Sequence, residues 1–195
     1  MWFNNKNNIK KEYSNTELSN MLRSSKSDRE VAFTYIYNKY SNRLYAFCIR
    51  ITDSKHDADD IFQETFTNFI NSIKSDTDLN NIGAYLIKIA RNIELNNKRS
   101  KKKITTNVED FDMFIFNDEN DRYEKKEEME IISRALDLLE FPYREVFILR
   151  QYHNMDYEVI AEITNEKVNV LRNRYFRAKA KLKEILDPIL NEKLN

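Results

Sequence analysis

The sequence predicts an all-α protein made of two small, unlike helical domains joined by an acidic linker. One glycine and two prolines among 195 residues leave almost nothing for tight hairpins, bulges or phosphate-cradling loops. Apolar residues recur every three or four positions through most of the chain, which is the period of an amphipathic helix. The 32 basic and 32 acidic residues balance, so the charge of each segment is more informative than the total.

The first half contains three predicted helices. The first begins at a capping box formed by Ser27 and Glu30, and the second begins at Ser54, with Asp57 three residues later. Cys48 lies beside the first apolar stripe, where a lone cysteine is expected to be a buried thiol. The three stripes are Ala32, Ile36, Tyr40, Leu44, Phe47 and Ile51; Ala58, Ile61, Phe62, Phe66, Phe69, Ile70 and Ile73; and Ile82, Tyr85, Leu86, Ile89, Ala90 and Ile93.

The charge reverses in the middle of the chain. Residues 109–130 include ten acidic and three basic side chains. We therefore place the domain boundary in this region, with a first domain over 1–103, an acidic linker over 104–121 and a second domain over 122–195.

Shorter helices follow in the second half. Pro142 fits the first turn of one helix, where its missing N–H costs nothing. Asp156 is a candidate cap for a helix over 157–164, and residues 165–167 form a three-residue turn. The last helix begins at Val168 and is expected to end near Leu186, before Pro188. Its inner face carries Val168, Leu171, Tyr175, Ala178, Leu182 and Ile185.

Two short helices joined by a three-residue turn, the second one basic, are typical of a helix-turn-helix that places its second helix in the major groove. No acid occurs over 167–183, whereas a solvated helix surface usually mixes acids and bases in i,i+4 pairs. Arginine can bond guanine, asparagine can pair with adenine, and long cationic side chains reach phosphates. The candidate DNA-binding residues are Asn169, Arg172, Asn173, Arg174, Arg177 and Lys179.

The third helix offers a second candidate surface. It ends in a basic cluster, and asparagines and Tyr85 are interleaved among its cations, as single-strand binding requires. Tyr85 also falls on the apolar stripe, so a core position is equally compatible with the pattern.

The carboxylates Asp57, Asp60 and Glu64 lie on one face of the second helix, a spacing that could hold a metal ion or divide acid and base roles. No second acidic helix completes such a cage, and no nucleophile is paired with a base by local spacing. A protein-binding face explains Asp60, Gln63 and Glu64 more simply. We predict no catalytic residue, no metal site and no cofactor.

Two signatures carry a family resemblance. Residues 57–69 read DADDIFQETFTNF and residues 84–103 read AYLIKIARNIELNNKRSKKK, and both resemble region 2 of the sigma-70 family, in its extracytoplasmic function (ECF) group. Residues 135–182 look like region 4 of the same group. The resemblance covers 28–186, and its two unlike signatures occur in the family's order.

This resemblance implies a promoter-specificity subunit of bacterial RNA polymerase. It implies that the loop over 74–81 holds a base flipped out of the stack, and that the region 4 helix reads the duplex −35 element. The implied polymerase-binding residues are Asp60, Gln63, Glu64 and Ile70. The implied residues for the melted −10 element are Tyr85, Lys88, Arg91, Asn92, Asn96, Lys98 and Arg99.

The chain departs from the family pattern in three places. Tyr85 stands where the family usually has tryptophan, and Asn169-Val170 replaces a common Gly-Thr, so promoter sequence is less transferable. Asn165 replaces the usual turn glycine and can adopt the left-handed conformation the turn needs.

The expected partners are core RNA polymerase, promoter DNA (duplex at −35, single-stranded at −10) and an anti-sigma factor. No apolar run approaches the roughly 20 residues of a membrane helix, and no signal peptide is recognisable, so we expect a cytoplasmic protein without membrane insertion. The alternative is a stand-alone helix-turn-helix regulator that binds duplex DNA without polymerase.

Overall fold

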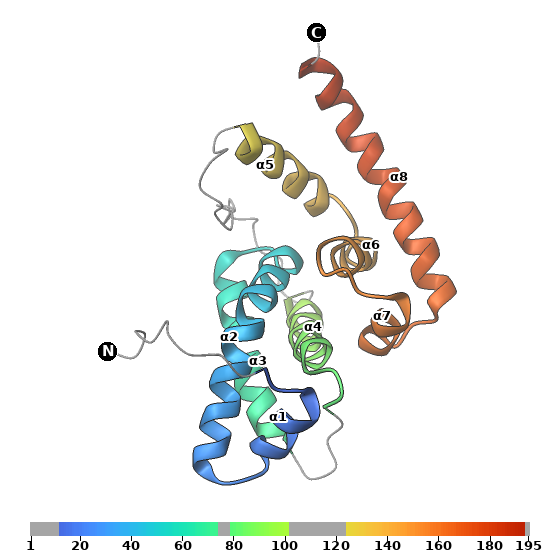
Figure 1. Cartoon of the computed structure of the whole chain (residues 1–195). Coiled ribbons are helices and arrows are strands. Elements are labelled where there is room, and N and C mark those ends of the chain that lie inside the picture. The colour runs from blue at the N-terminus through green and yellow to red at the C-terminus, as the bar shows by residue number, and fades with distance from the viewer. Residues whose placement is uncertain (1–11, 74–78, 102–123, 194–195) are drawn as a thin grey trace.

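The computed structural model describes residues 12–73, 79–101 and 124–193. Over these residues the regular structure is helical without strands, which confirms the predicted all-α class. Helices α1–α4 form a bundle, and α5–α8 form a second group beside it (Figure 1). The elements are α1 (Asn15–Leu22), α2 (Lys26–Ile51), α3 (Lys55–Ser72), α4 (Ile82–Lys101), α5 (Glu124–Asp137), α6 (Phe141–Phe147), a π-helical turn η1 (Ile148–Tyr152), α7 (Tyr157–Thr164) and α8 (Val168–Lys193).

The start of α2 differs from the prediction. Its N-cap is Ser25, whose hydroxyl accepts a hydrogen bond from the Asp28 amide at 3.2 Å. The Asp28 carboxylate accepts hydrogen bonds from the hydroxyls of Ser25 (2.8 Å) and Ser24 (2.7 Å). Ser27 and Glu30 have the same spacing as Ser25 and Asp28, but the paired contacts at Asp28 favour the earlier start. The predicted capping box at Ser27 is therefore wrong.

Helices α3 and α4 begin with side-chain caps. The Ser54 hydroxyl accepts a hydrogen bond from the Asp57 amide at 3.0 Å, which confirms the predicted cap. At α4 the Asn81 side chain accepts one from the Ala84 amide at 3.0 Å. Gly83, the chain's single glycine, lies against Tyr40, because a Cβ there would be 2.9 Å from that ring.

The predicted apolar stripes form the core of the bundle. Phe47, Phe69 and Ile82 are fully buried, and Cys48 is a buried thiol as predicted. Ile70 is an exception, because 43% of its surface is exposed at the outer side of α3.

The two halves of the chain pack together around one apolar cluster. Val146, Leu149 and Ile160 join the buried residues of α2–α4 in that cluster. The His153 ring stands edge-on to Phe47 at 5.7 Å between ring centres. The predicted linker over 104–121 lies outside the described residues, so the domain boundaries stay a prediction.

The second half carries the predicted helix-turn-helix. Pro142 lies in the first turn of α6, and Asp156 is the N-cap of α7, although its side chain accepts from Arg150 instead of the helix (3.2 Å). Asn165 ends α7 in the left-handed conformation (φ 57°, ψ 36°), as expected.

The predicted end of the last helix is wrong, because α8 continues through Pro188 to Lys193. A proline lacks the backbone N–H that would donate to the carbonyl of the preceding turn. Here the packing of apolar side chains holds that turn in place. Ile185 and Leu186 in that turn pack against the second apolar cluster, formed by α5 and α8.

Candidate nucleic-acid interface

Helix α8 presents a basic outer surface. Leu171, Ala178 and Leu182 are at most 5% exposed and turn one side of the helix inward. The opposite side points to solvent. We call its exposed predicted residues the α8 face: Asn169, Arg172, Asn173, Arg177 and Lys179.

The sixth predicted residue of α8 is held differently. The Arg174 guanidinium donates to the Glu166 carboxylate at 2.8 Å, and its side chain is 26% exposed. Arg172 lies over the Tyr157 ring at 5.5 Å while its side chain stays exposed. Of these two arginines, Arg172 is therefore the more available for a ligand.

Helix α3 exposes the predicted polymerase-binding residues together. Asp60, Gln63, Glu64 and Ile70 are all exposed, and we call them the α3 face. Asp60 lies 3.5 Å from the His56 ring nitrogen, and Glu64 accepts a hydrogen bond from Asn68 at 3.2 Å. Throughout the described residues, no group of three or more His, Cys, Asp or Glu side chains is placed to hold a metal ion.

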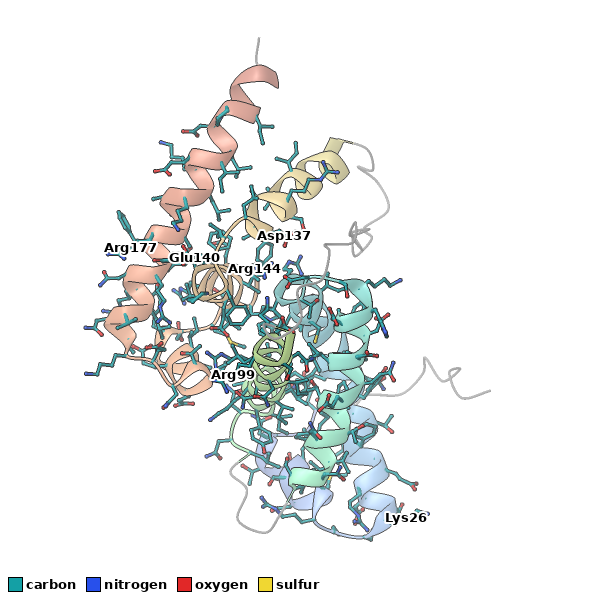
Figure 2. The ribbon with its side chains drawn as sticks, turned by 180° about the vertical axis from the view of Figure 1, so that it is seen from behind. Lys26, Arg99, Asp137, Glu140, Arg144 and Arg177 are labelled. Carbon is teal, nitrogen blue, oxygen red and sulfur yellow. The ribbon has the colours of Figure 1, made fainter. Side chains whose placement is uncertain are left out.

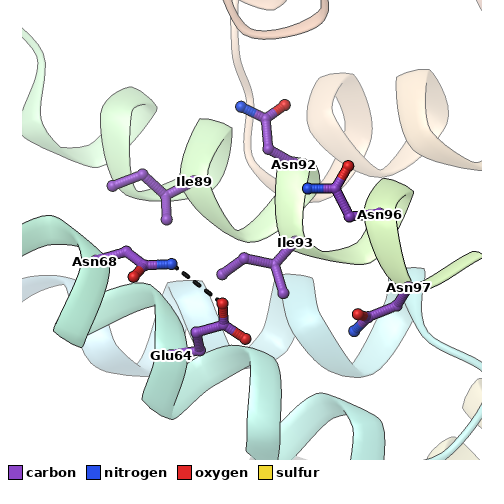
Figure 3. Close-up of a pocket in the computed structure, with 7 residues that line it drawn as sticks. All are labelled: Glu64, Asn68, Ile89, Asn92, Ile93, Asn96 and Asn97. Atoms are coloured by element: carbon purple, nitrogen blue, oxygen red, sulfur yellow. Dashed lines mark hydrogen bonds between the residues drawn. The ribbon is translucent and has the colours of Figure 1, made fainter. Parts of the chain in front are cut away.

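Four of the seven predicted −10 residues are exposed on α4, namely Lys88, Asn92, Asn96 and Arg99, and we call them the α4 face. A shallow pocket of about 250 Å³ lies between α3 and α4 (Figure 3). Its amide groups can each donate and accept hydrogen bonds. The pocket is lined by Glu64, Asn68, Ile89, Asn92, Ile93, Asn96 and Asn97.

Tyr85 is half-buried and packs within the bundle. Its hydroxyl donates to the Ser72 hydroxyl at 2.9 Å, which fits the core alternative. The predicted specificity loop over 74–81 is described only from Leu79 onward. Leu79 is buried, and the Asn80 carbonyl accepts a hydrogen bond from the Asn15 side chain at 2.6 Å.

The remaining two predicted −10 residues form ion pairs. Arg91 binds Glu145 of α6, and the two side chains are 14% and 3% exposed. The Lys98 ammonium lies 3.2 Å from Glu94 and 3.2 Å from Asp53. While the two halves are packed together, Arg91 and Lys98 are therefore both paired with carboxylates.

Arg144 links the bundle to the second half. It is 4% exposed, and it donates to Asp53 at 3.2 Å and to Asp137 at 3.0 Å. Figure 2 shows Arg144 and Asp137 where α5 and α6 meet the bundle. Partial burial opposes ionisation of Asp53, but the Lys98 and Arg144 charges outweigh it and lower the pKa of Asp53.

Two buried groups have strongly shifted pKa values. Burial raises the pKa of Glu94 to about 7, and this outweighs the attraction of its neighbour Lys98. Burial, assisted by the charges of Arg43 and Arg50, lowers the pKa of His153 to about 4, so this histidine is neutral at physiological pH.

Two family descriptions match the two halves of the chain in order: Sigma-70 region 2 matches residues 36–104, and Sigma-70, region 4 matches residues 129–182. The ECF sigma factor EcfG of Rhodopseudomonas palustris (strain TIE-1) is 30% identical over 145 residues, which cover 73% of this chain and 78% of that protein. This chain belongs to the ECF group of the sigma-70 family. This sigma factor directs RNA polymerase to promoters, and the stand-alone regulator is not supported.

Other comparisons agree with this sigma factor's family and fold. The ECF sigma factor SigM of Bacillus subtilis (strain 168) is 28% identical over 158 residues, covering 80% of this chain and 96% of SigM. The sigma factor RpoE, solved with the anti-sigma factor NepR from Bartonella quintana, has a TM-score of 0.65 at 21% identity, covering 80% of this chain and 96% of RpoE. CnrH, solved with the cytosolic domain of CnrY, has a TM-score of 0.64 at 20% identity, covering 90% and 97%.

Sequence reasoning missed the contacts that join the two halves of this sigma factor. Asp53, Arg144 and Glu145 were not among the predicted site residues, because their partners lie far along the chain. The exposed aromatic residue Phe176 of α8 was also not among the predicted site residues. Its sequence signal is its position out of phase with the apolar stripe through Leu171 and Tyr175. Among the described residues, no helix is long and apolar enough to cross a membrane.

Proposed function

We propose that this sigma factor binds polymerase and the two promoter elements through three separate surfaces. The α3 face binds core RNA polymerase, the α4 face binds the single-stranded −10 element, and the α8 face binds the duplex −35 element. The α8 face is the observation that carries the proposal. Its three cations, on the second helix of a helix-turn-helix, point to solvent, and no acid occurs over 167–183. The exposed carboxylates of the α3 face would be repelled by phosphates, which favours a protein partner there.

We further infer that the chain has no catalytic chemistry of its own, and that 1–103 and 122–195 act as separate domains once bound to polymerase. Reading promoter DNA requires shape, charge and hydrogen bonds, which the three surfaces supply. Core polymerase and promoter DNA lie in the bacterial cytoplasm, so we infer that the protein acts there.

We also infer an anti-sigma factor as a partner. The similar RpoE is bound to the anti-sigma factor NepR. The α3 face combines three polar residues with Ile70, which is 43% exposed, and a regulatory protein could cover this surface and exclude polymerase.

Run-off transcription on genomic DNA, with core polymerase and with or without this protein, tests the proposal. Discrete new transcripts are expected, and aligning their start sites gives both promoter elements. The triple variant Asp60→Ala, Gln63→Ala, Glu64→Ala should lose core binding and all transcripts. A control variant, Glu30→Ala, changes an exposed acid of α2 and should keep both. Full core binding by the triple variant would contradict the role of the α3 face.

A further inference from the structure

Helix α1 packs against α2 through its apolar side. Leu18 and Leu22 of α1 are buried. Just before α1, the Tyr13 ring meets the Tyr35 ring of α2 edge-on, with 5.1 Å between the ring centres. With α1 held in this way, its first turn lies beside the N-terminal end of α4 (Figure 1).

One side chain of α1 reaches the three residues that lead into α4, which we call the α4 entry segment (79–81). The Asn15 amide donates a hydrogen bond to the Asn80 carbonyl at 2.6 Å, across 65 positions of the chain. On either side of Asn80, Leu79 is buried, and the Asn81 side chain accepts from the Ala84 amide at 3.0 Å. The Asn15 contact is the one of these three that can be removed without disturbing the core or the cap of α4.

The α4 entry segment continues the α4 face toward its N-terminal end. Asn81 precedes Lys88 by seven residues, and Asn92 follows Lys88 by four, so the three lie along one side of the helix. The helical spacing already holds at Asn81, whose carbonyl accepts from the Tyr85 amide at 3.0 Å. Asn80 and Asn81 are exposed, and their amides can bond base edges. A single strand that lies on the α4 face therefore reaches the entry segment.

Helix α1 itself is a poor surface for DNA. It contains no lysine or arginine, and its Glu17 is exposed, so it would not attract phosphates. Its influence on a bound strand must pass through the contact with the α4 entry segment.

We propose that Asn15 is a positioning residue for the −10 element. By holding the Asn80 carbonyl, it fixes the α4 entry segment in the place where that segment contacts one base of the single strand. The inference rests on the proposed role of the α4 face.

The experiment uses the sigma factor assembled with core polymerase and a single-stranded oligonucleotide with the −10 sequence found from the run-off start sites. Each base is replaced in turn, and affinity is measured for the wild type, for Asn15→Ala and for Asn20→Ala. The last is a matched control, because Asn20 is an exposed asparagine of the same helix. Binding to the −35 duplex and to core polymerase is measured alongside.

Asn15→Ala should bind the unchanged oligonucleotide about five-fold more weakly, which is the fold-change that one hydrogen bond of about 1 kcal/mol produces. At one position the cost of base replacement should be smaller than in the wild type, and at the other positions it should be the same. Binding to the −35 duplex and to core polymerase should not change, because neither the α8 face nor the α3 face is touched. Asn20→Ala should match the wild type throughout.

A second variant, Asn15→Asp, separates the lost contact from the stability of α1. A carboxylate has the shape of the amide but no N–H to donate, and in the first turn of a helix it is favourable. Asn15→Asp should lose dependence on the same base as Asn15→Ala. Thr16→Asp places the same charge on the next residue, which is exposed, and keeps the Asn15 contact. It should retain the wild-type dependence on that base.

Three results would overturn the proposal. The first is wild-type affinity of Asn15→Ala for every oligonucleotide. The second is equal weakening at the −10 strand, the −35 duplex and core polymerase, which would give Asn15 a general structural role. The third is the same loss of base dependence in Thr16→Asp and Asn15→Asp, which would make the effect one of charge. A wild-type holoenzyme that distinguishes no base of the oligonucleotide would instead remove the role of the α4 face, and this inference with it.

Discussion

The Arg91 guanidinium and the Glu145 carboxylate join α4 to α6 through two hydrogen bonds, although the residues are 54 positions apart. Both side chains are nearly buried, at 14% and 3% exposure. The pair ties a proposed −10 residue to the half of the chain that carries the α8 face. Arg91 can bind DNA only after the two halves separate.

Replacing Glu145 with glutamine should open this arrangement. The change leaves the Arg91 charge buried without its partner, and breaking such a pair costs about 3–5 kcal/mol. Separation of the halves returns Arg91 to water and relieves that cost. We expect a larger radius of gyration in small-angle X-ray scattering and tighter binding to a single-stranded −10 oligonucleotide.

The matched control is the double variant Arg91→Met, Glu145→Leu. It removes both charges and fills their space with apolar groups, a change that is often neutral or stabilising. The double variant should stay as compact as the wild type. If Glu145→Gln is equally compact, the ion pair does not hold the halves together.

Glu94 should make stability depend on pH. Its pKa rises on folding from an ordinary value of 4.5 to about 7, so between these pH values the folded chain holds a proton that the unfolded chain has lost. The resulting stability is fully present below about pH 4.5 and is lost as pH rises through about 7. Lys98, Asp53 and Asp57 are the charged groups that act on this carboxyl.

Glu94→Gln tests this by urea unfolding across that range. The wild-type free energy of unfolding, minus that of the variant, should fall by up to about 3 kcal/mol as pH rises. Taking the difference removes the contributions of His153 and the other titrating groups. A difference that is constant with pH would show that Glu94 does not titrate there.

Much of the fold could be predicted because its signals are local. The Ser54 cap, the Asn165 turn and the apolar stripes each involve residues a few positions apart. Over such distances helix geometry fixes which side chains can contact one another. The contacts between the halves could not be predicted this way. Asp53 and Arg144 are 91 positions apart, and their spacing carries no helical period.

For the candidate site, too, local features could be predicted and contacts between distant residues could not. Helical periodicity identifies which residues face outward, so the α8 face and the polar residues of the α3 face were predictable as surfaces. Ile70 was not, because periodicity places it on the buried apolar stripe, whereas 43% of its surface is exposed. Periodicity does not say which outward cations have partners: Arg174 is engaged by Glu166 and Arg91 by Glu145. Phe176 was not among the predicted site residues, although its position lies outside the apolar stripe through Leu171 and Tyr175.

The two neighbouring arginines of α8 should differ in their effect on DNA binding. Arg172→Ala removes an exposed cation of the α8 face, whereas Arg174 is paired with Glu166 at 2.8 Å. On a −35 duplex, Arg172→Ala should weaken binding and reduce the slope of log affinity against log salt by about one. Arg174→Ala should leave that slope nearly unchanged. Equal slopes for the two variants would contradict this difference, and Lys26→Ala, at the far end of the bundle, is the charge control (Figure 2).

Asn165 should be replaceable by glycine but not by alanine. Its backbone has φ 57° and ψ 36°, and its amide donates to the Ala161 carbonyl at 2.8 Å. Alanine in the left-handed region costs about 1–2 kcal/mol because its Cβ crowds the carbonyl, whereas glycine has no Cβ. Urea unfolding should show Asn165→Ala destabilised by about 1 kcal/mol and Asn165→Gly within about 0.5 kcal/mol of the wild type. Because the turn sets the angle of α8, Asn165→Ala should also weaken binding to the −35 duplex. If the alanine variant matches glycine in both measurements, the turn does not depend on the left-handed residue.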